Sequence, residues 1–231
     1  MKQRAFQPTF VKYNSYTPSP CLRRGAAVRL TMKKYLLLLS ICISNVVWAN
    51  NVIPSDNWDH LALNEGLSQN EVRSIVQDHR GLMWMGTQDG LNCYDGQTIK
   101  KYRHNPFDST TLSHDDITFL YEDARHHLWV GTTKGLNRRL FRHHTFQHFP
   151  QIQGMVTSIV EDKNHTIWVG TSSGLWCLRP QGDEFQHFLY RHSADDAYSL
   201  SHDFVGSMTL DADGNLWIGT AKGLNKLLMG N

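Results

Sequence analysis

One pattern, Trp-x-Gly-Thr-x-x-Gly-Leu, occurs four times and restricts the fold more than any other feature of the chain. The four copies begin at Trp84, Trp129, Trp168 and Trp217. Each lies in a block of fixed length, with aliphatic residues twelve and nine positions before the tryptophan and an aspartate six positions before it. Between blocks the spacing varies, because successive tryptophans are 45, 39 and 49 residues apart. Fixed units joined by variable connections predict a propeller, a solenoid or an array.

The aspartates and glycines of the block recur in every copy, and we interpret them, with the tryptophans, as structural repeat residues. The aspartate begins a turn in which its carboxylate can accept hydrogen bonds from backbone amides. The second glycine stands where a three-residue hairpin needs a positive φ, and the first where another chain segment comes close. These residues are Asp78, Asp123, Asp162 and Asp211; Gly86, Gly131, Gly170 and Gly219; and Gly90, Gly135, Gly174 and Gly223.

Each unit reads as four antiparallel strands. The tryptophan segment is a short apolar strand, a third strand follows the hairpin, and a fourth carries apolar residues three positions apart, as in Phe146 and Phe149. Nothing helical separates the units, so we predict an all-β fold of about four propeller blades. In such a fold the tryptophan covers the face between neighbouring blades, and we expect its truncation to cost roughly 3–5 kcal/mol.

The units resemble a known repeat. Leu112-Ser-His-Asp-Asp-Ile117, Leu128-Trp-Val-Gly-Thr132 and Gly135-Leu-Asn137 are similar to the repeat of the two-component regulator propeller family. The resemblance implies an exported sensor domain of a hybrid histidine kinase or a membrane-bound diguanylate cyclase, of which this chain would be the N-terminal portion. The third unit departs from the pattern, because it lacks the Leu-Ser opening and has Trp176 in place of the usual Asn.

The chain divides into four parts by composition. We expect residues 1–31 to be a misassigned upstream extension and residues 32–49 to be a signal peptide, since Met32-Lys-Lys34 precedes an apolar run that ends at Val47-Trp-Ala49. Residues 50–66 contain a strand that could complete a last blade, and 67–231 form the repeats, at 67–111, 112–154, 155–199 and 200–231, the last without its outer strand. The alternatives of a truncated sensor and a closed four-bladed ring remain open.

Charge and cysteine content exclude some classes of function. Eight of the 23 Lys and Arg residues lie in residues 1–49, which hold no acid, so 15 basic groups face 21 acidic groups in residues 50–231. A net negative body does not favour nucleic-acid binding. Of the cysteines beyond the expected cleavage site, Cys93 and Cys177 occupy equivalent places in non-adjacent units, so we expect two free, buried or half-buried thiols.

Candidate sites for chemistry are weak. His126-His127 and His143-His144 with His148 suggest a metal, but they lie in turns and outer strands, and His114 and His202 share a repeat position. The Asp211-Ala-Asp213-Gly214 turn lacks the later ligands of a calcium loop. The acid pairs Asp115-Asp116 and Asp195-Asp196 lie in connections, where aspartate commonly forms turns. We therefore predict no catalytic residue, no cofactor and no metal.

Recognition is expected in the segments that differ between units, above all the polar connections 103–111 and 191–199. The favoured function is a non-enzymatic periplasmic module that senses a small extracellular ligand, with carbohydrate as one class, or contacts a sensor subunit. Self-association through open strand edges is also expected. The alternatives are a propeller enzyme of lyase or glycosidase type, acting through acids and histidines, and an inactive gene fragment.

Overall fold

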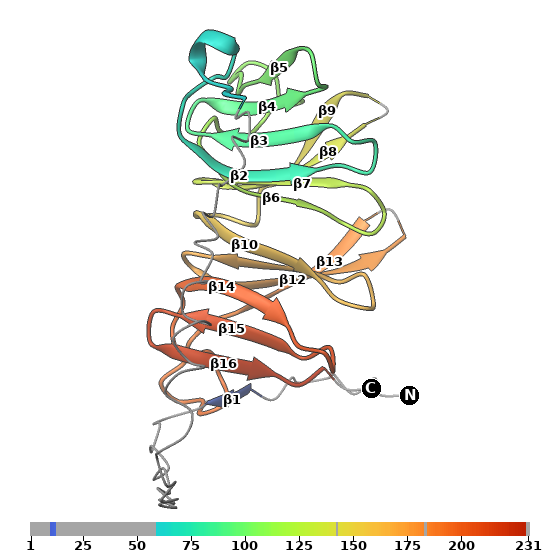
Figure 1. Ribbon diagram of the computed structural model, residues 1–231. Coiled ribbons are helices and arrows are strands. Elements are labelled where there is room, and N and C mark those ends of the chain that lie inside the picture. The colour runs from blue at the N-terminus through green and yellow to red at the C-terminus, as the bar shows by residue number, and fades with distance from the viewer. Residues whose placement is uncertain (1–9, 13–58, 142, 183, 230–231) are drawn as a thin grey trace, which may run out of the picture. The chain divides into compact units, whose positions relative to one another are not determined.

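A computed structural model describes residues 10–12, 59–141, 143–182 and 184–229. The expected signal peptide, residues 32–49, lies outside these residues, as do most of 1–31 and residues 50–58. No helix in the described part of the chain is long and apolar enough to cross a membrane. The strands form four antiparallel sheets of four strands each, so the predicted all-β fold of propeller blades is confirmed (Figure 1).

The first three sheets follow chain order from the inner to the outer strand, as do the three strands that the repeat itself supplies to the fourth. Blade 1 contains β2 (Val72–Gln77), β3 (Met83–Thr87), β4 (Gly90–Tyr94) and β5 (Ile99–Tyr102); blade 2 contains β6 (Ile117–Glu122), β7 (Leu128–Thr132), β8 (Gly135–Leu140) and β9 (Thr145–Phe149). Blade 3 contains β10 (Val156–Glu161), β11 (Ile167–Thr171), β12 (Gly174–Gln181) and β13 (Glu184–Tyr190); blade 4 contains β14 (Val205–Leu210), β15 (Leu216–Thr220) and β16 (Gly223–Leu227).

The outer position of blade 4 is held by an N-terminal strand. β1 (Phe10–Lys12) pairs antiparallel with β16, Val11 opposite Lys226. The sequence led us to expect a completing strand within residues 50–66. Residues 50–58 lie outside the described residues, and residues 59–66 contain a short 3-10 turn, η2 (Leu63–Glu65), so that expectation stays a prediction. Pairing between an edge strand and a segment more than 200 residues away is non-local, and the repeat pattern does not encode it.

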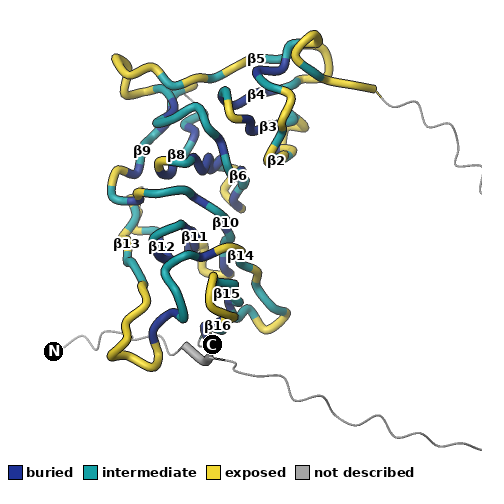
Figure 2. Tube along the Cα trace, turned by 90° about the vertical axis from the view of Figure 1, so that its left-hand side faces the viewer, coloured by how far each residue is buried: buried dark blue, intermediate teal, exposed yellow. Residues whose placement is uncertain are grey.

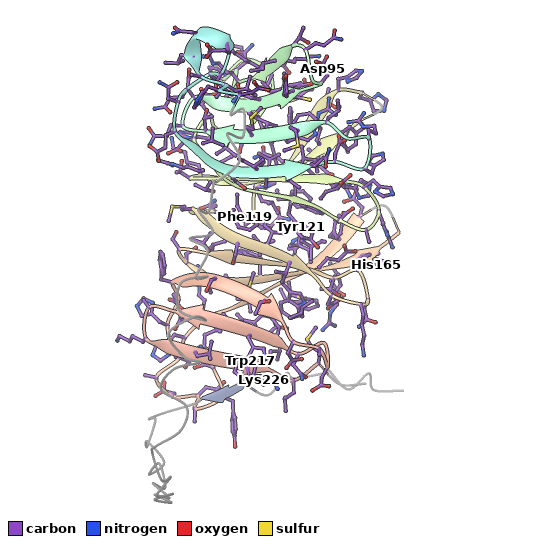
Figure 3. All side chains as sticks on the ribbon, viewed as in Figure 1. Asp95, Phe119, Tyr121, His165, Trp217 and Lys226 are labelled. Carbon is purple, nitrogen blue, oxygen red and sulfur yellow. The ribbon has the colours of Figure 1, made fainter. Side chains whose placement is uncertain are left out.

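Neighbouring blades pack face to face in chain order, and three apolar clusters fill the three interfaces (Figure 1). The tryptophan of each preceding blade enters the cluster of the next one: Trp84, Trp129 and Trp168 are at most 3% exposed. Trp217 of blade 4 is only half-buried and lies against the Lys226 ammonium, 4.8 Å from the ring centre (Figure 3). The described blades thus form an open row, as in a partial propeller.

The first glycine of each block is required by the next blade. A Cβ atom on Gly86, Gly131 or Gly170 would lie 2.6–2.7 Å from a methyl group of Ile117, Val156 or Val205, respectively. These β-branched residues are the aliphatic positions twelve residues before the following tryptophan. One repeat position therefore packs on another across each interface, which explains why both are fixed.

The aspartate of each block joins its turn to the tryptophan. In all four copies one carboxylate oxygen accepts the backbone N–H groups two and four residues later, and the other accepts the indole N–H of the tryptophan six residues later. The indole contacts measure 2.9, 2.8, 3.0 and 2.9 Å from blade 1 to blade 4. The backbone contacts were expected from the turn, whereas the indole contact was not.

The second glycine of each block has a positive φ in all four copies, between 112° and 140°. In the aspartate turns, Gly81 and Gly214 have φ near 80°, and His126 and His165 take the same left-handed conformation at φ 66° and 60° in blades 2 and 3. Such a conformation costs a residue other than glycine on the order of 1–3 kcal/mol.

The two departures of the third unit from the repeat concern the donor and the acceptor of one hydrogen bond that the other units share. Asn92, Asn137 and Asn225 each accept the backbone N–H of the serine that opens their unit, at 2.9–3.0 Å. Blade 3 lacks both the serine that would donate this hydrogen bond and the asparagine that would accept it. Trp176 can therefore replace the asparagine without leaving a serine N–H unpaired. The two losses compensate each other.

Candidate functional site

The feature that breaks the repeat most strongly is a groove at one end of the interface between blades 1 and 2. Its volume is about 690 Å³. The β2–β3 turn, the β6–β7 turn and the end of β8 with the turn after it supply its lining, which comprises His79, Arg80, Arg125, His126, His127, Arg139, Leu140, Phe141 and His143. The described lining holds three arginines and four histidines but no Asp or Glu. The arginines carry its charge, and the carboxylates of Asp78, Glu122 and Asp123 contact Arg80, His79 and His127 of the lining.

Arg139 is the central residue of this groove. It lies on β8, is 3% exposed, and its guanidinium carbon is 4.8 Å from the ring centre of Trp84, 5.2 Å from that of Tyr102 and 4.6 Å from that of Phe141. One terminal nitrogen, Nη2, donates to the Tyr102 hydroxyl at 3.0 Å. Nε and Nη1 are buried and find no acceptor among the described residues.

The three rings offset only part of the cost of this burial. A cation–π contact contributes about 0.5–2 kcal/mol. Removing an unpaired charge from water costs several kcal/mol, and each unsatisfied N–H adds about 1–3 kcal/mol. Arg139 is therefore a residue that the packing tolerates but does not fully stabilise.

The other blades show that the fold itself does not need an arginine at this position. The residue ten positions after the tryptophan is Tyr94 in blade 1, Leu178 in blade 3 and Leu227 in blade 4. Both leucines are fully buried core residues. In blades 1, 3 and 4 this residue lies opposite the apolar residue that precedes the tryptophan, as Leu178 lies opposite Ile167.

The other two arginines of the groove differ in whether an acidic side chain neutralises them. Arg80 forms a 2.7 Å ion pair with Asp78, the turn aspartate of blade 1. Arg125 is exposed, and its side chain makes no hydrogen bond or ion pair with the described residues. Phe141 lies over the guanidinium groups of Arg80 and Arg139 and is itself half-buried. Arg125 and the covered Arg139 are thus the charges that could receive an anion.

Beside the groove, His79, Glu122 and His126 place their potential ligand atoms within 4.8 Å of one another. These are the described residues that could hold a metal ion. One oxygen of Glu122 already accepts the backbone N–H of His79 at 3.1 Å and contacts its ring nitrogen at 2.6 Å, and the two imidazole rings stack at 4.1 Å. Nearby arginines oppose a cation, so this arrangement fits a salt-bridged turn better than a metal centre. The absence of a metal stays a prediction.

The next interface offers an internal comparison for this cluster. Glu161 and His165 of blade 3 repeat the Glu–His contact at 2.6 Å, but Ala124 stands where blade 1 has His79. Glu161 accepts the Ala124 backbone N–H at 2.6 Å. The Glu–backbone contact is therefore a repeat feature, and the histidine of blade 1 is an addition to it.

The acidic pairs singled out in the sequence are engaged in turns. Asp115 accepts the His104 backbone N–H at 2.6 Å, and Asp116 pairs with Arg73 at 2.6 Å. Asp196 accepts the Tyr198 backbone N–H at 2.8 Å. The structure does not bring these carboxylates together as an acid and base pair.

The histidine candidates also separate. His148 contacts the Thr111 carbonyl at 2.6 Å, and His127 contacts Asp123 at 3.0 Å. His114 and His202 each accept, through Nδ1, the backbone N–H two residues later. Of the predicted clusters, only His126, His127 and His143 reach the groove.

The turn aspartates are held as anions. Burial would raise the pKa of Asp78, but hydrogen bonds from Trp84 and Arg80 outweigh it and hold the pKa below its usual value. Burial would also raise the pKa of Asp123, but hydrogen bonds from His127 and Trp129 outweigh it and lower the pKa. In blade 4 the Trp217 indole lowers the pKa of Asp211, and Lys226 pairs with it at 3.1 Å. That ammonium stands where a calcium loop would need its ion.

The two polar connections are built alike. His104 and His192 each contact the carbonyl of the leucine that opens the next unit, at 2.6 and 2.7 Å. The backbone N–H of each histidine donates to an aspartate eleven residues later. Their exposed tips differ, with Phe107 97% exposed in the first and Tyr198 62% exposed in the second (Figure 2). Most of each connection is thus repeat structure, contrary to our expectation that these segments would be the variable ones.

Arg139, Arg80 and Phe141 were missed by the sequence reasoning. The signal was present for Arg139, because an arginine replaces tyrosine or leucine at one fixed position after the tryptophan. The role of Arg139 depends on its contacts with Trp84 and Tyr102 of another blade, and a local sequence pattern does not predict these contacts.

Comparisons with known proteins agree with the fold. The family model described as "Two component regulator propeller" matches residues 66–89, 111–134, 150–173 and 199–222. Histidine kinase P4 of Formosa agariphila is 57% identical over 49 residues, which are 21% of this chain and 4% of that protein.

Two solved structures share the fold at low identity. The extracellular domain of a hybrid two-component system from B. thetaiotaomicron is 22% identical, with a TM-score of 0.60, over 72% of this chain and 22% of that one. PorZ, a surface component of the type-IX secretion system of Porphyromonas gingivalis, is 15% identical, with a TM-score of 0.52, over 67% of this chain and 24% of that one. The chain therefore spans less than a quarter of the length of these relatives.

Proposed function

Because the chain belongs to the two-component regulator propeller family, we propose that it is a non-enzymatic recognition module of an exported bacterial sensor. The observation that carries this proposal is the contrast between repeat and groove. Residues common to all four units are engaged in packing and turns, whereas three arginines, four histidines and Phe141 line the groove between blades 1 and 2. A surface that differs from its structural copies is where a binding function can be added without loss of the fold.

Export and signalling follow from the sequence and the relatives together. The basic and apolar run of residues 32–49 is typical of a signal peptide. A stretch of high identity is shared with a protein named a histidine kinase, and the fold is shared with an extracellular domain of a two-component system. We place the blades in the periplasm, with a kinase or a diguanylate cyclase as the output module.

We propose recognition and not turnover, because the predicted acid pairs are engaged elsewhere, where Asp115 accepts the His104 backbone N–H and Asp116 pairs with Arg73. The pKa values of Asp78 and Asp123 are lowered, so both stay ionised. The oxygens of Asp78 also take part in five hydrogen bonds and those of Asp123 in four. A solved streptogramin B lyase has a similar fold at 15% identity and a TM-score of 0.50, a likeness that concerns the fold alone and does not favour a lyase.

The partner of the module is a small extracellular ligand, with carbohydrate as one class, or a neighbouring sensor subunit. The positive groove favours a ligand that carries negative charge. Self-association through the edge strands remains part of the proposal, since strand edges pair readily when they are uncovered.

Two measurements test the proposal. The full chain, expressed in a Gram-negative host, is fractionated and its mature N-terminus is determined by mass spectrometry. We expect periplasmic protein that begins at Asn50 and that therefore lacks β1, so that the outer edge of β16 is free of this strand. Purified protein is then incubated with a panel of acidic and neutral oligosaccharides, and the sugars are analysed by mass. Recovery of unchanged sugars agrees with recognition, whereas cleaved products would establish the enzyme alternative, and retention in the cytoplasm would defeat the periplasmic assignment.

A further inference from the structure

We propose that the groove between blades 1 and 2 binds an organic carboxylate through the guanidinium group of Arg139. This inference deepens the proposed recognition function, and it takes its biological meaning from that function. The site itself stands on the geometry of Arg139 and on the comparison of that position between the blades.

The first observation is the unsatisfied hydrogen-bonding capacity of Arg139. Its side chain is almost fully buried, and Nε and Nη1 have no acceptor among the described residues. Nε and one terminal nitrogen form the fork that matches the two oxygens of a carboxylate. A carboxylate on the edge shared by Nε and Nη2 would satisfy Nε and neutralise the charge, and a further oxygen of the same ligand would satisfy Nη1, which lies on the other edge of the guanidinium.

The second observation is that the same fold position is filled by leucine in blades 3 and 4. Leu178 and Leu227 are buried there without strain or unsatisfied groups. Replacing a leucine by an arginine in a packed interface gives no structural advantage, because a hydrophobic residue of similar volume avoids the burial of charge. The arginine in blade 2 is therefore explained by a partner that the other blades do not bind.

The third observation is the charge around the site. Arg80 and Arg125 line the same groove, and the described lining residues include no acid. Arg80 is already paired with Asp78, so that pair carries no net charge, whereas Arg125 remains available for a second anionic group. Positive walls in a partly enclosed groove raise the local concentration of anions.

Phe141 decides what kind of anion fits. Its ring covers the guanidinium groups of Arg80 and Arg139, at 4.3 and 4.6 Å, and it is half-buried. The ring must move aside for an anion to reach Nε and Nη1, and it then presents an apolar face beside the bound group. That combination favours an anion attached to a carbon skeleton over a fully hydrated inorganic ion.

The test is calorimetric titration of the full chain with citrate, sulfate and phosphate at one ionic strength set with chloride. We expect citrate to bind, and Arg139→Leu, which copies blades 3 and 4, to lose at least tenfold in affinity while its melting temperature stays equal or rises. Arg138→Leu is the matched control, because it removes the same charge from the opposite face of β8, where Arg138 bonds to Gln147. Its affinity for citrate should change less than threefold.

A second variant separates the fork from the charge. Arg139→Lys keeps the charge and loses the bidentate geometry, so we expect a loss of several-fold for citrate. Equal affinity of the wild type and Arg139→Leu, or a large drop in the stability of Arg139→Leu, would overturn the site. Sulfate or phosphate binding as tight as citrate would overturn the carboxylate assignment. Conversion of a bound carboxylate would defeat the recognition function and leave the site standing.

Discussion

Gly131 provides a quantitative test of how the blades are stacked. A methyl group at this position would place its carbon 2.6 and 2.7 Å from two carbons of Val156 in the next blade. Contacts this short require the interface to shift, and overpacking of this kind costs about 1–3 kcal/mol. In a domain of this size, about 2 kcal/mol lowers the melting temperature by roughly 4–8 °C. We therefore expect Gly131→Ala to show that decrease in a thermal melt followed by circular dichroism.

Two further variants make this test specific. Gly219→Ala is the control, because its added carbon would meet only Ser207, whose hydroxyl at 2.9 Å can rotate away; we expect a much smaller change. Val156→Ala removes the clashing Cγ1 methyl, keeps the Cβ atom at 2.7 Å and opens a cavity into which the added methyl can shift. The double variant Gly131→Ala with Val156→Ala should be more stable than the sum of the two single changes predicts, by about 1–2 kcal/mol. Strict additivity would refute the proposed contact between the blades.

Three other predictions concern the turns and the thiols. Asp123→Asn replaces the carboxylate that accepts the Trp129 indole N–H by an amide, and we expect urea unfolding to show about 2–3 kcal/mol of destabilisation. Asp211→Asn should lose less stability, because its contact is more exposed. Equal losses in the two variants would contradict this reasoning. Hydrogen bonds lower the pKa values of Asp78 and Asp123 against the effect of burial. The stability that these two ionised carboxylates contribute is therefore present above the ordinary aspartate pKa of about 3.9 and is lost as the pH falls through their folded pKa values. The urea concentration at the unfolding midpoint should decrease below about pH 4, and it should decrease less steeply in Asp123→Asn. Burial raises the pKa of Cys177 to about 11, so a thiol reagent at pH 8 should modify it only after denaturation, and rapid labelling of the native protein would show that the interface opens.

The sequence was informative wherever the structure is local and repeated. Strands, hairpin glycines and the turn aspartates follow from spacing within one block, and four copies of that block test one another. The free, buried state of Cys93 and Cys177 also agrees with the expectation from their equivalent positions.

The rest depends on contacts between distant segments. The spacing of six residues between Asp123 and Trp129 was visible, but its hydrogen bond exists only because the hairpin folds the indole back over the turn. The strand β1 pairs with β16 across nearly the whole chain. The environment of Arg139 is formed by Trp84 and Tyr102 of the neighbouring blade. These features require the blades to be assembled before they can be recognised.

The central claim is that repeat residues hold the fold, whereas a residue that departs from the repeat carries recognition. The most direct test is the shift in melting temperature that citrate produces, measured for the wild type, Gly131→Ala and Arg139→Leu at constant ionic strength. We expect Gly131→Ala to melt lower with an unchanged citrate shift, and Arg139→Leu to melt at least as high as the wild type with no shift. A citrate shift that persists in Arg139→Leu, or that disappears in Gly131→Ala while the protein remains folded, would contradict the claim.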